Sequence, residues 1–215
     1  MKNLSRQKGF SLIELILALI IVSIIAGFAI ISVASARKYV ADTQAFEIVD
    51  ILDQARQSAL NQRRTFRVEI NKTKNQITLI NEDKFDDVSD DKIVKSLPLR
   101  NNVVINQVPG NITEAPTASS SIPVLNYAAS SYPLSKNEEK ITLRFARNGR
   151  VLDTGTDHVG TGSTVRGATI YVYTNKEKTN TPEIIRAVTV THTSGNTSIL
   201  KCSFDTTGKC GNWVR

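Results

Sequence analysis

Gly9, Phe10 and Glu14 are the residues whose types and spacing suggest chemistry near the N-terminus. Between Phe10 and Ile31, Glu14 is the sole ionisable side chain, and the run contains no proline. A carboxylate inside a membrane costs about 2.5–3.5 kcal/mol on insertion scales, so Glu14 needs a positively charged partner. Cleavage after Gly9 would supply one, because the new amine of Phe10 lies close to Glu14 in sequence. The same amine on a neighbouring copy would serve equally well, which predicts a processed helix that packs against copies of itself.

The segment 10–31 is long enough to cross a bilayer as a helix, since a span needs about 20 apolar residues. Three cations precede it: Lys2, Arg6 and Lys8. By the positive-inside rule they hold residues 1–9 in the cytoplasm. The chain after Arg37 is therefore expected on the periplasmic side of the membrane.

Two simpler explanations compete with a processed helix. An ordinary membrane anchor could carry Glu14 by chance. Alternatively, Ala34-Ser35-Ala36 has the form of a signal-peptidase site after an apolar core. The run from Phe10 to Ile31 is long for such a core, which is usually about 7–15 residues, and Glu14 interrupts it. We therefore favour cleavage after Gly9.

The sequence KGFSLIEL at residues 8–15, followed by an apolar run, resembles the class III signal of type IV pilins and type II secretion pseudopilins. The resemblance implies cleavage between Gly9 and Phe10 by prepilin peptidase and N-methylation of Phe10. It also implies that Glu14 neutralises the amine of an adjacent subunit during filament assembly. The partners implied are other pilin or pseudopilin subunits, the peptidase and the inner membrane.

Composition is that of one folded domain behind an N-terminal segment. The chain has 215 residues and a formal net charge of +7. From Arg37 onward there are 24 Lys and Arg against 19 Asp and Glu, a net +5. This mild excess permits the binding of polyanions without requiring it.

Cys202 and Cys210 lie close together near the C-terminus. In an extracytoplasmic domain such a pair indicates a disulfide that closes a short loop. A zinc site would need four ligands, and only His158 and His192 are available, at no recognisable spacing. We therefore expect a disulfide and neither a metal nor another cofactor.

Hydrophobic periodicity predicts an α+β fold. Apolar residues recur at steps of three and four and form the stripe of an amphipathic helix: Ala41, Ala45, Ile48, Leu52, Ala55 and Ala59. The helix 32–64 is expected to continue the span 10–31, with any bend near Gly27 or 32–35, and to pack on a domain at 65–215. Alternating residues and turn signals there predict an antiparallel sheet. The expected strands are 65–70, 76–80, 92–97, 103–108, 140–146, 168–174, 183–191 and 197–203.

Three stretches lack a regular pattern. Residues 82–91 hold six carboxylates, and we expect a solvated acidic loop rather than a calcium site, because the glycine and glutamate of an EF-hand loop are missing. Residues 109–121 are rich in Pro, Thr, Ala and Ser and predict a flexible loop or insertion. Residues 153–167 contain four glycines and predict a long loop.

A narrower resemblance rests on two further stretches. Residues 51–64 (ILDQARQSALNQRR) are similar to the ARxxAxxR helix end of the GspH/FimT/FimU minor pilins, and residues 145–150 (FARNGR) to the F-x-x-x-G-R turn of that family. The resemblance implies a minor pilin or pseudopilin fold: a long N-terminal helix on antiparallel sheet. It also implies a subunit at or near the filament tip that primes assembly.

One branch of that family binds DNA through a C-terminal Gly-Arg-x-Arg turn. The comparable turn here is 194–198 (SGNTS), which has no arginine. The cations near the C-terminus are scattered, and Trp213 could stack on a base: Arg186, Lys201, Lys209 and Arg215. DNA binding is therefore a second hypothesis, and surface adhesion through the loops 109–121 and 153–167 is a third.

Catalytic constellations are missing from the sequence. There is no Gly-x-Ser-x-Gly and no His-Glu-x-x-His. Asp157-His158 lies in a glycine-rich stretch, and Gly160-Thr161-Gly162 lacks the ending of a phosphate-binding loop. We therefore expect a non-enzymatic structural subunit, held in the inner membrane by one span until it enters a pilus or a secretion pseudopilus.

Overall fold

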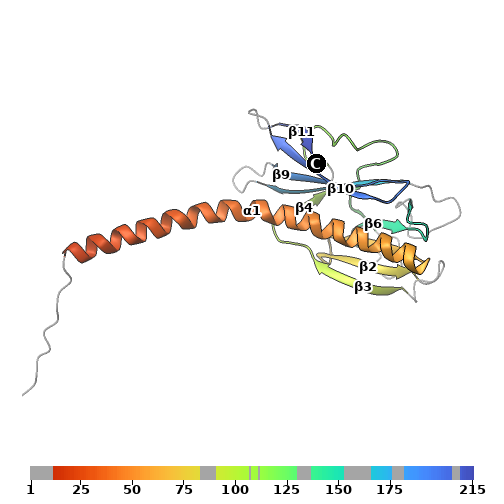
Figure 1. The fold of residues 1–215 in the computed structure, drawn as a ribbon, viewed down its shortest axis with the longest axis horizontal. Coiled ribbons are helices and arrows are strands. Elements are labelled where there is room, and N and C mark those ends of the chain that lie inside the picture. The colour runs from red at the N-terminus through yellow and green to blue at the C-terminus, as the bar shows by residue number, and fades with distance from the viewer. Residues whose placement is uncertain are drawn as a thin grey trace, which may run out of the picture. The chain divides into compact units, whose positions relative to one another are not determined.

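The computed structural model describes residues 12–82, 91–106, 108–110, 112–129, 137–152, 166–175, 182–204 and 209–215. Among these residues the fold is α+β, with one helix and two antiparallel sheets (Figure 1). The helix α1 runs Leu12–Gln62. The chain forms two compact units, one ending at Tyr39 and the other beginning at Val40. The second half of α1 therefore belongs to the same unit as both sheets.

The first sheet has the strand order β3-β2-β1-β6-β5, with β7 paired to β6. Its central hairpin joins β1 to β2 in the register Asn71↔Gln76, as the polar turn between them predicts. The second sheet has the order β11-β10-β9-β8-β4. The strands are β1 (Thr65–Asn71), β2 (Gln76–Glu82), β3 (Lys92–Pro98), β4 (Val104–Asn106), β5 (Ala128–Ala129), β6 (Glu139–Phe145), β7 (Val151–Leu152), β8 (Ala168–Asn175), β9 (Pro182–Val190), β10 (Thr197–Phe204) and β11 (Cys210–Val214).

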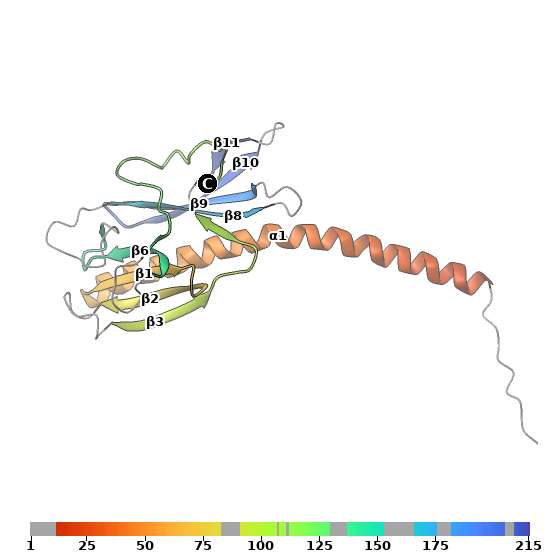
Figure 2. The ribbon, with the colours of Figure 1, turned by 180° about the vertical axis from the view of Figure 1, so that it is seen from behind.

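The α+β prediction is confirmed, and the eight expected strands are present. The expectation of a single sheet was incomplete, because the strands divide between two sheets. Figures 1 and 2 show β1–β3 on one side of the second half of α1 and β8–β10 on the other. Both sheets therefore pack on the same helix.

One hydrophobic core joins α1 to both sheets. All six residues of the predicted helical stripe, Ala41 to Ala59, are completely buried. All but Ala41 are clustered with alternate side chains of β1 (Phe66, Val68 and Ile70) and with residues of β8 and β9. The small alanine side chains let the sheets approach the helix closely, while Ile48 and Leu52 fill the space between them.

Polar contacts fix the two flanks of this half of α1. Toward the first sheet, Lys95 Nζ lies 3.0 Å from Asp50 Oδ2. Toward the second sheet, Arg186 pairs with Asp42. Asp53 Oδ1 accepts a hydrogen bond of 2.6 Å from Thr197 Oγ1. Because these contacts reach α1 from both sides, they set the rotation of the helix about its axis.

The segment 108–125 covers the outer face of the second sheet. Ala115 N donates to Tyr171 Oη at 2.8 Å, and Leu125 N donates to Thr169 O at 2.9 Å. Ala115 is 2% exposed and Tyr171 is fully buried, and burial raises the pKa of Tyr171. The described part of the segment 109–121 has no helix or strand, as the prediction of a loop implies. Ala115 and Thr117 nevertheless contact the second sheet.

The predicted disulfide between Cys202 and Cys210 is present, with the two Cα atoms 5.8 Å apart. It joins β10 to β11 next to the register shift between Ser203 and Phe204. Both cysteines are buried in the small apolar cluster on the outer face of the second sheet. Thr113 N bonds to Cys210 O, and Trp213 Nε1 donates to Thr113 O, so β11 also secures the covering segment.

Two turns meet at the C-terminal end of α1. The turn after β6 brings Gly149 (φ +76°) against Leu60, and the β9–β10 turn brings Gly195 (φ +65°) against the carbonyl of Gly149. Arg56 Nε donates to Ser194 O at 2.6 Å. A Cβ on Gly195 would lie 2.3 Å from Gly149 O. Glycine at 195 is therefore required by backbone conformation and by space.

We expect Gly195→Ala to destabilise the unit that begins at Val40 by about 2–3 kcal/mol, from left-handed strain and the clash with Gly149. Gly110→Ala is the matched control. Nothing lies within 4 Å of its Cβ position, so its effect should stay within about 0.5 kcal/mol. The measurement is the urea midpoint of each variant. Equal midpoints for the two variants would contradict this account of the junction.

Candidate functional site

Gly9 and Phe10, the expected processing residues, lie outside the described residues. Glu14 is described and stands in the first turn of α1. Its surroundings on the helix are apolar and include Leu15, Leu17 and Ala18. No ion pair to Glu14 occurs in the described part of the chain. The pairing of Glu14 with the amine of Phe10 on an adjacent subunit therefore stays a prediction.

The first fifteen described residues of α1 present apolar side chains in every direction around the helix. Eleven large aliphatic side chains between Leu12 and Ile25 are each at least 47% exposed. A helix that is apolar all round is typical of burial in a membrane or among other helices. Within the residues that the structure describes, no helix is both long enough and apolar enough to cross a membrane. The predicted span 10–31 lies partly outside them, because residue 10 and the side chains from residue 27 are not described.

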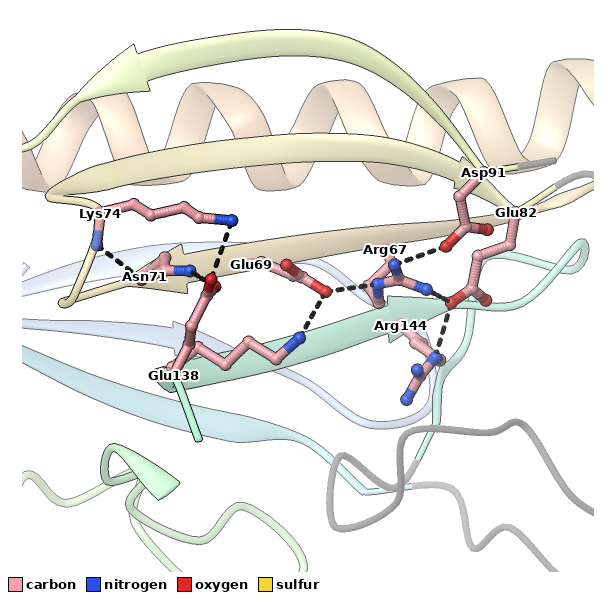
Figure 3. A network of polar contacts seen from close by, with 9 residues as sticks. Arg67, Glu69, Asn71, Lys74, Glu82, Asp91, Glu138 and Arg144 are labelled. Carbon is pink, nitrogen blue, oxygen red and sulfur yellow. Dashed lines mark hydrogen bonds and ion pairs between the residues drawn. The ribbon is translucent and has the colours of Figure 1, made fainter. Parts of the chain in front are cut away.

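A network of buried ion pairs lies on the face of the first sheet that is turned away from α1 (Figure 3). Arg67 alternates along β1 with core residues and is almost fully buried. Its guanidinium contacts Glu69 at 2.7 Å, Asp91 at 2.7 Å, and also Glu82. Glu82 in turn accepts a bond from Arg144 Nε at 2.9 Å. Arg67 therefore ties together the ends of β2 and β3.

The network extends along the same face through Lys140, whose Nζ lies 3.0 Å from Glu69 Oε1. Its six members are three cations and three anions: Arg67, Arg144, Lys140, Glu69, Glu82 and Asp91. Burial opposes the charge of Arg67, but Glu82, Glu69 and Asp91 together outweigh it and raise the pKa of Arg67. A buried set of charges that balances in this way suits a structural role.

A second group lies at the other end of the same face. Glu138 accepts hydrogen bonds from Asn71 Nδ2 at 2.7 Å and contacts Lys74 Nζ at 2.9 Å (Figure 3). Burial opposes the charge of Glu138, but these bonds outweigh it and lower its pKa. The contribution of Glu138 to stability is therefore present above the ordinary glutamate pKa and is lost as the pH falls through the lowered value.

Four arginines gather where α1 ends and the strands β6 and β7 meet. Arg63 ends the helix with φ +54°. Phe145 at the end of β6 pairs with Phe66 near the start of β1, so the chain after β6 leaves the sheet at the end where α1 passes into β1. Arg147 and Arg150 belong to the turn after β6, in which Ala146 N donates to Arg150 O at 2.9 Å. All four side chains are exposed. We call Arg63, Arg147 and Arg150 the arginine cluster.

The cations expected near the C-terminus do not form a site. Arg186 is 5% exposed and pairs with Asp42 on α1. Lys201 is exposed on β10, and Arg215 is exposed after β11. Trp213 packs against Tyr171, with ring centroids 6.0 Å apart. Arg186 and Trp213 therefore make contacts within the fold, and DNA binding near the C-terminus stays a prediction.

The acidic segment 82–91 is described only at its ends. Glu82 and Asp91 are about 10% exposed or less as side chains and bind Arg67, so the expectation of solvated acids is wrong for these two. Residues 83–90, Asp157, His158 and the stretch 153–165 lie outside the described residues. Within the described residues, no group of three or more His, Cys, Asp or Glu could hold a metal ion.

A comparison with protein-family models matches residues 4–33 to the prokaryotic N-terminal methylation motif. The matched stretch includes Gly9, Phe10 and Glu14. The motif is a type IV pilin-like signal, and it supports a pilin or pseudopilin. Comparisons with curated proteins and with solved structures gave no match. Assignment to the GspH/FimT/FimU minor pilins therefore stays a prediction.

The structure brings together the stretches on which that narrower prediction depends. Arg56 and Leu60 of the helix end, Gly149 of the turn after β6, and Gly195 of the β9–β10 turn are in mutual contact. Sequence analysis identified each stretch separately but not their contact.

We expect Arg67→Ala to lower the free energy of unfolding by about 3–5 kcal/mol, because it leaves Glu69, Glu82 and Asp91 buried without this cation. Lys72→Ala is the control. Lys72 pairs with Glu139 on the surface, with both side chains more than half exposed, so its loss should cost about 1 kcal/mol or less. Urea unfolding of each variant measures the difference. Similar losses for both would show that Arg67 does not hold the network.

Proposed function

We propose that this protein is a minor pilin or pseudopilin. In this proposal it is a non-enzymatic subunit that prepilin peptidase cleaves between Gly9 and Phe10 and that then enters a type IV pilus or a type II secretion pseudopilus. The observation that carries the proposal is the methylation motif over residues 4–33. Proteins with such a motif are generally structural, and the motif implies assembly with other pilin subunits.

The exposed apolar half of α1 supports membrane storage followed by assembly. Full burial of one large aliphatic side chain stabilises a protein by about 1.5–3 kcal/mol. Eleven such side chains between Leu12 and Ile25 are at least 47% exposed. Lipid and the helices of neighbouring subunits are the two environments that would cover them. The inner membrane before assembly and the filament interior afterwards fit both requirements.

Glu14 is proposed as the residue that sets the position of one subunit against the next. Its carboxylate would pair with the methylated amine of Phe10 on an adjacent subunit. An unpaired carboxylate among apolar helices is far less stable than a paired one, so the pairing selects one axial position. A role at or near the filament tip is proposed from the resemblance to the minor pilins.

The second candidate function is that of a DNA-binding minor pilin for natural transformation. The turn 194–198 does not favour it, because its side chains include no arginine. The arginine cluster does favour it, since its exposed guanidinium groups have no carboxylate partner among the described residues and such groups are suited to phosphate.

Gly9→Phe is expected to block processing, because a bulky side chain would crowd the bond that the peptidase cuts. Mass spectrometry of the membrane-bound protein should show a mature chain that begins with methylated Phe10 for the wild type. The variant should keep residues 1–9. A wild-type chain that begins at Met1 or at Arg37 would refute the proposal.

Glu14→Ala is expected to leave insertion and cleavage intact but to reduce incorporation into filaments at least tenfold, since a lost charge pair of about 1.4 kcal/mol already gives that factor. Glu14→Asp, which keeps the charge on a shorter side chain, should retain more assembly. Quantitative immunoblotting of sheared filaments against the membrane fraction measures the ratio. Normal incorporation of Glu14→Ala would exclude the proposal that Glu14 sets the position of one subunit against the next.

A further inference from the structure

A hollow opens on the surface of α1 one turn beyond Glu14, and Ala18 forms its floor. Its walls are the six residues that surround Ala18 on a helical surface, one, three or four positions away: Glu14, Leu15, Leu17, Leu19, Ile21 and Val22. Between Leu12 and Val22, Ala18 is the one side chain smaller than valine. The hollow therefore exists because one short side chain stands among longer ones.

The walls of the hollow combine one carboxylate with aliphatic side chains. Leu15, Leu17 and Val22 are each at least 57% exposed, so the described part of the chain does not cover the hollow. Glu14 makes no ion pair with another described residue. An alanine in a helix needs no special explanation, since alanine is the best helix former. The carboxylate beside Ala18 is what points to a ligand, and that ligand must carry both a cation and a compact apolar group.

We propose that the hollow at Ala18 receives the aromatic ring of Phe10 from a second copy of this chain, while the amine of that Phe10 pairs with Glu14. After cleavage behind Gly9, the amine and the ring belong to one terminal residue and lie about 4–5 Å apart by ordinary bond lengths. Four residues on a helix, the step from Glu14 to Ala18, span about 6 Å along its axis. One terminal phenylalanine can therefore reach both positions, and the hollow, of about 560 Å³, is ample for its ring.

This inference rests on the proposed function, which supplies the processed N-terminus, and adds a second point of contact to the charge pair. A charge pair alone leaves the direction of approach open, whereas a ring seated among the neighbours of Ala18 fixes it. Helices in lipid associate mainly through close packing, and small residues let them approach. A lipid acyl chain in the hollow would leave the Glu14 carboxylate unpaired in hydrocarbon, which is unfavourable.

The test compares variants of the full chain by their incorporation into filaments, measured by immunoblotting of sheared filaments against the membrane fraction. Ala18→Leu fills the hollow, and we expect it to lower incorporation about tenfold, because overpacking forces the neighbouring helix away. Ser23→Leu is the control, because it adds similar bulk about 140° around the same helix. Ser23 is exposed and donates to Leu19 O of its own helix at 2.8 Å, and the control should stay within about twofold of the wild type.

Phe10→Ala and the double variant Phe10→Ala/Ala18→Leu complete a mutant cycle. Phe10→Ala empties the hollow and should also lower incorporation about tenfold. In the double variant the leucine occupies the space that the ring has left, so the loss should not exceed that of either single variant. Independent effects would instead multiply to about a hundredfold. Residues eight apart on one helix lie about 12 Å apart along its axis, so coupling between positions 10 and 18 arises between copies.

Mass spectrometry first confirms that each variant is cleaved behind Gly9 and methylated, and Phe10→Leu replaces Phe10→Ala if the latter is not processed. Normal incorporation of Ala18→Leu, an equal loss for Ser23→Leu, or losses that multiply in the cycle would each overturn the inference. A wild-type chain that is not cleaved behind Gly9, or normal assembly of Glu14→Ala, would refute the proposed function itself. If those two results are as expected and the cycle shows no coupling, the role of the hollow alone fails.

Discussion

The packing of one alanine-rich helical stripe against two sheets is the constraint on which the domain depends. Ala41, Ala45, Ala55 and Ala59 are completely buried where β1 and β8–β9 converge on α1. Any larger side chain there would push a sheet away from the helix, because protein cores are close-packed and overpacking costs about 1–3 kcal/mol. The contacts of Asp42 and Asp50 on the two flanks then fix the helix in rotation. The stripe therefore sets the position of the two sheets relative to each other.

The two units of the chain differ in how much of their apolar surface is buried within the chain. The unit from Val40 contains a complete core, a covering segment over its second sheet and a disulfide. The aliphatic side chains from Leu12 to Ile25 remain exposed. Within the described residues, one unit therefore buries its own core, while the aliphatic side chains of the other are left without cover from the chain.

Periodicity made much of this fold predictable. The stripe of α1 and the β1–β2 hairpin follow directly from spacing and turn residues, and the close cysteine pair indicated its disulfide. The two-residue strands β5 and β7 are too short to show a hydrophobic pattern. In β11, Gly211 and Asn212 interrupt the pattern that would predict a strand. The composition of the segment 109–121 predicted a loop. It did not show that Ala115 and Thr117 of this loop bond to the second sheet.

The ion pairs were not predictable, because they depend on register. Arg67 faces Arg144 across β1 and β6, and Glu82 lies where both can reach it. Sequence alone shows only separate charges at these positions. For the N-terminal site, by contrast, a local motif contains all the relevant residues, so Gly9, Phe10 and Glu14 could be proposed without any knowledge of the fold.

The same strand pair carries arginines in two different physical situations. Arg67 and Arg144 are nearly inaccessible, so each must be paired, since an isolated buried charge would cost several kcal/mol. A few residues further along, Arg147 and Arg150 are in water, where an unpaired guanidinium costs almost nothing. The buried pair is therefore explained by stability alone. The exposed arginines make no comparable contribution through the described residues, so exposure decides whether an arginine on these two strands needs a partner.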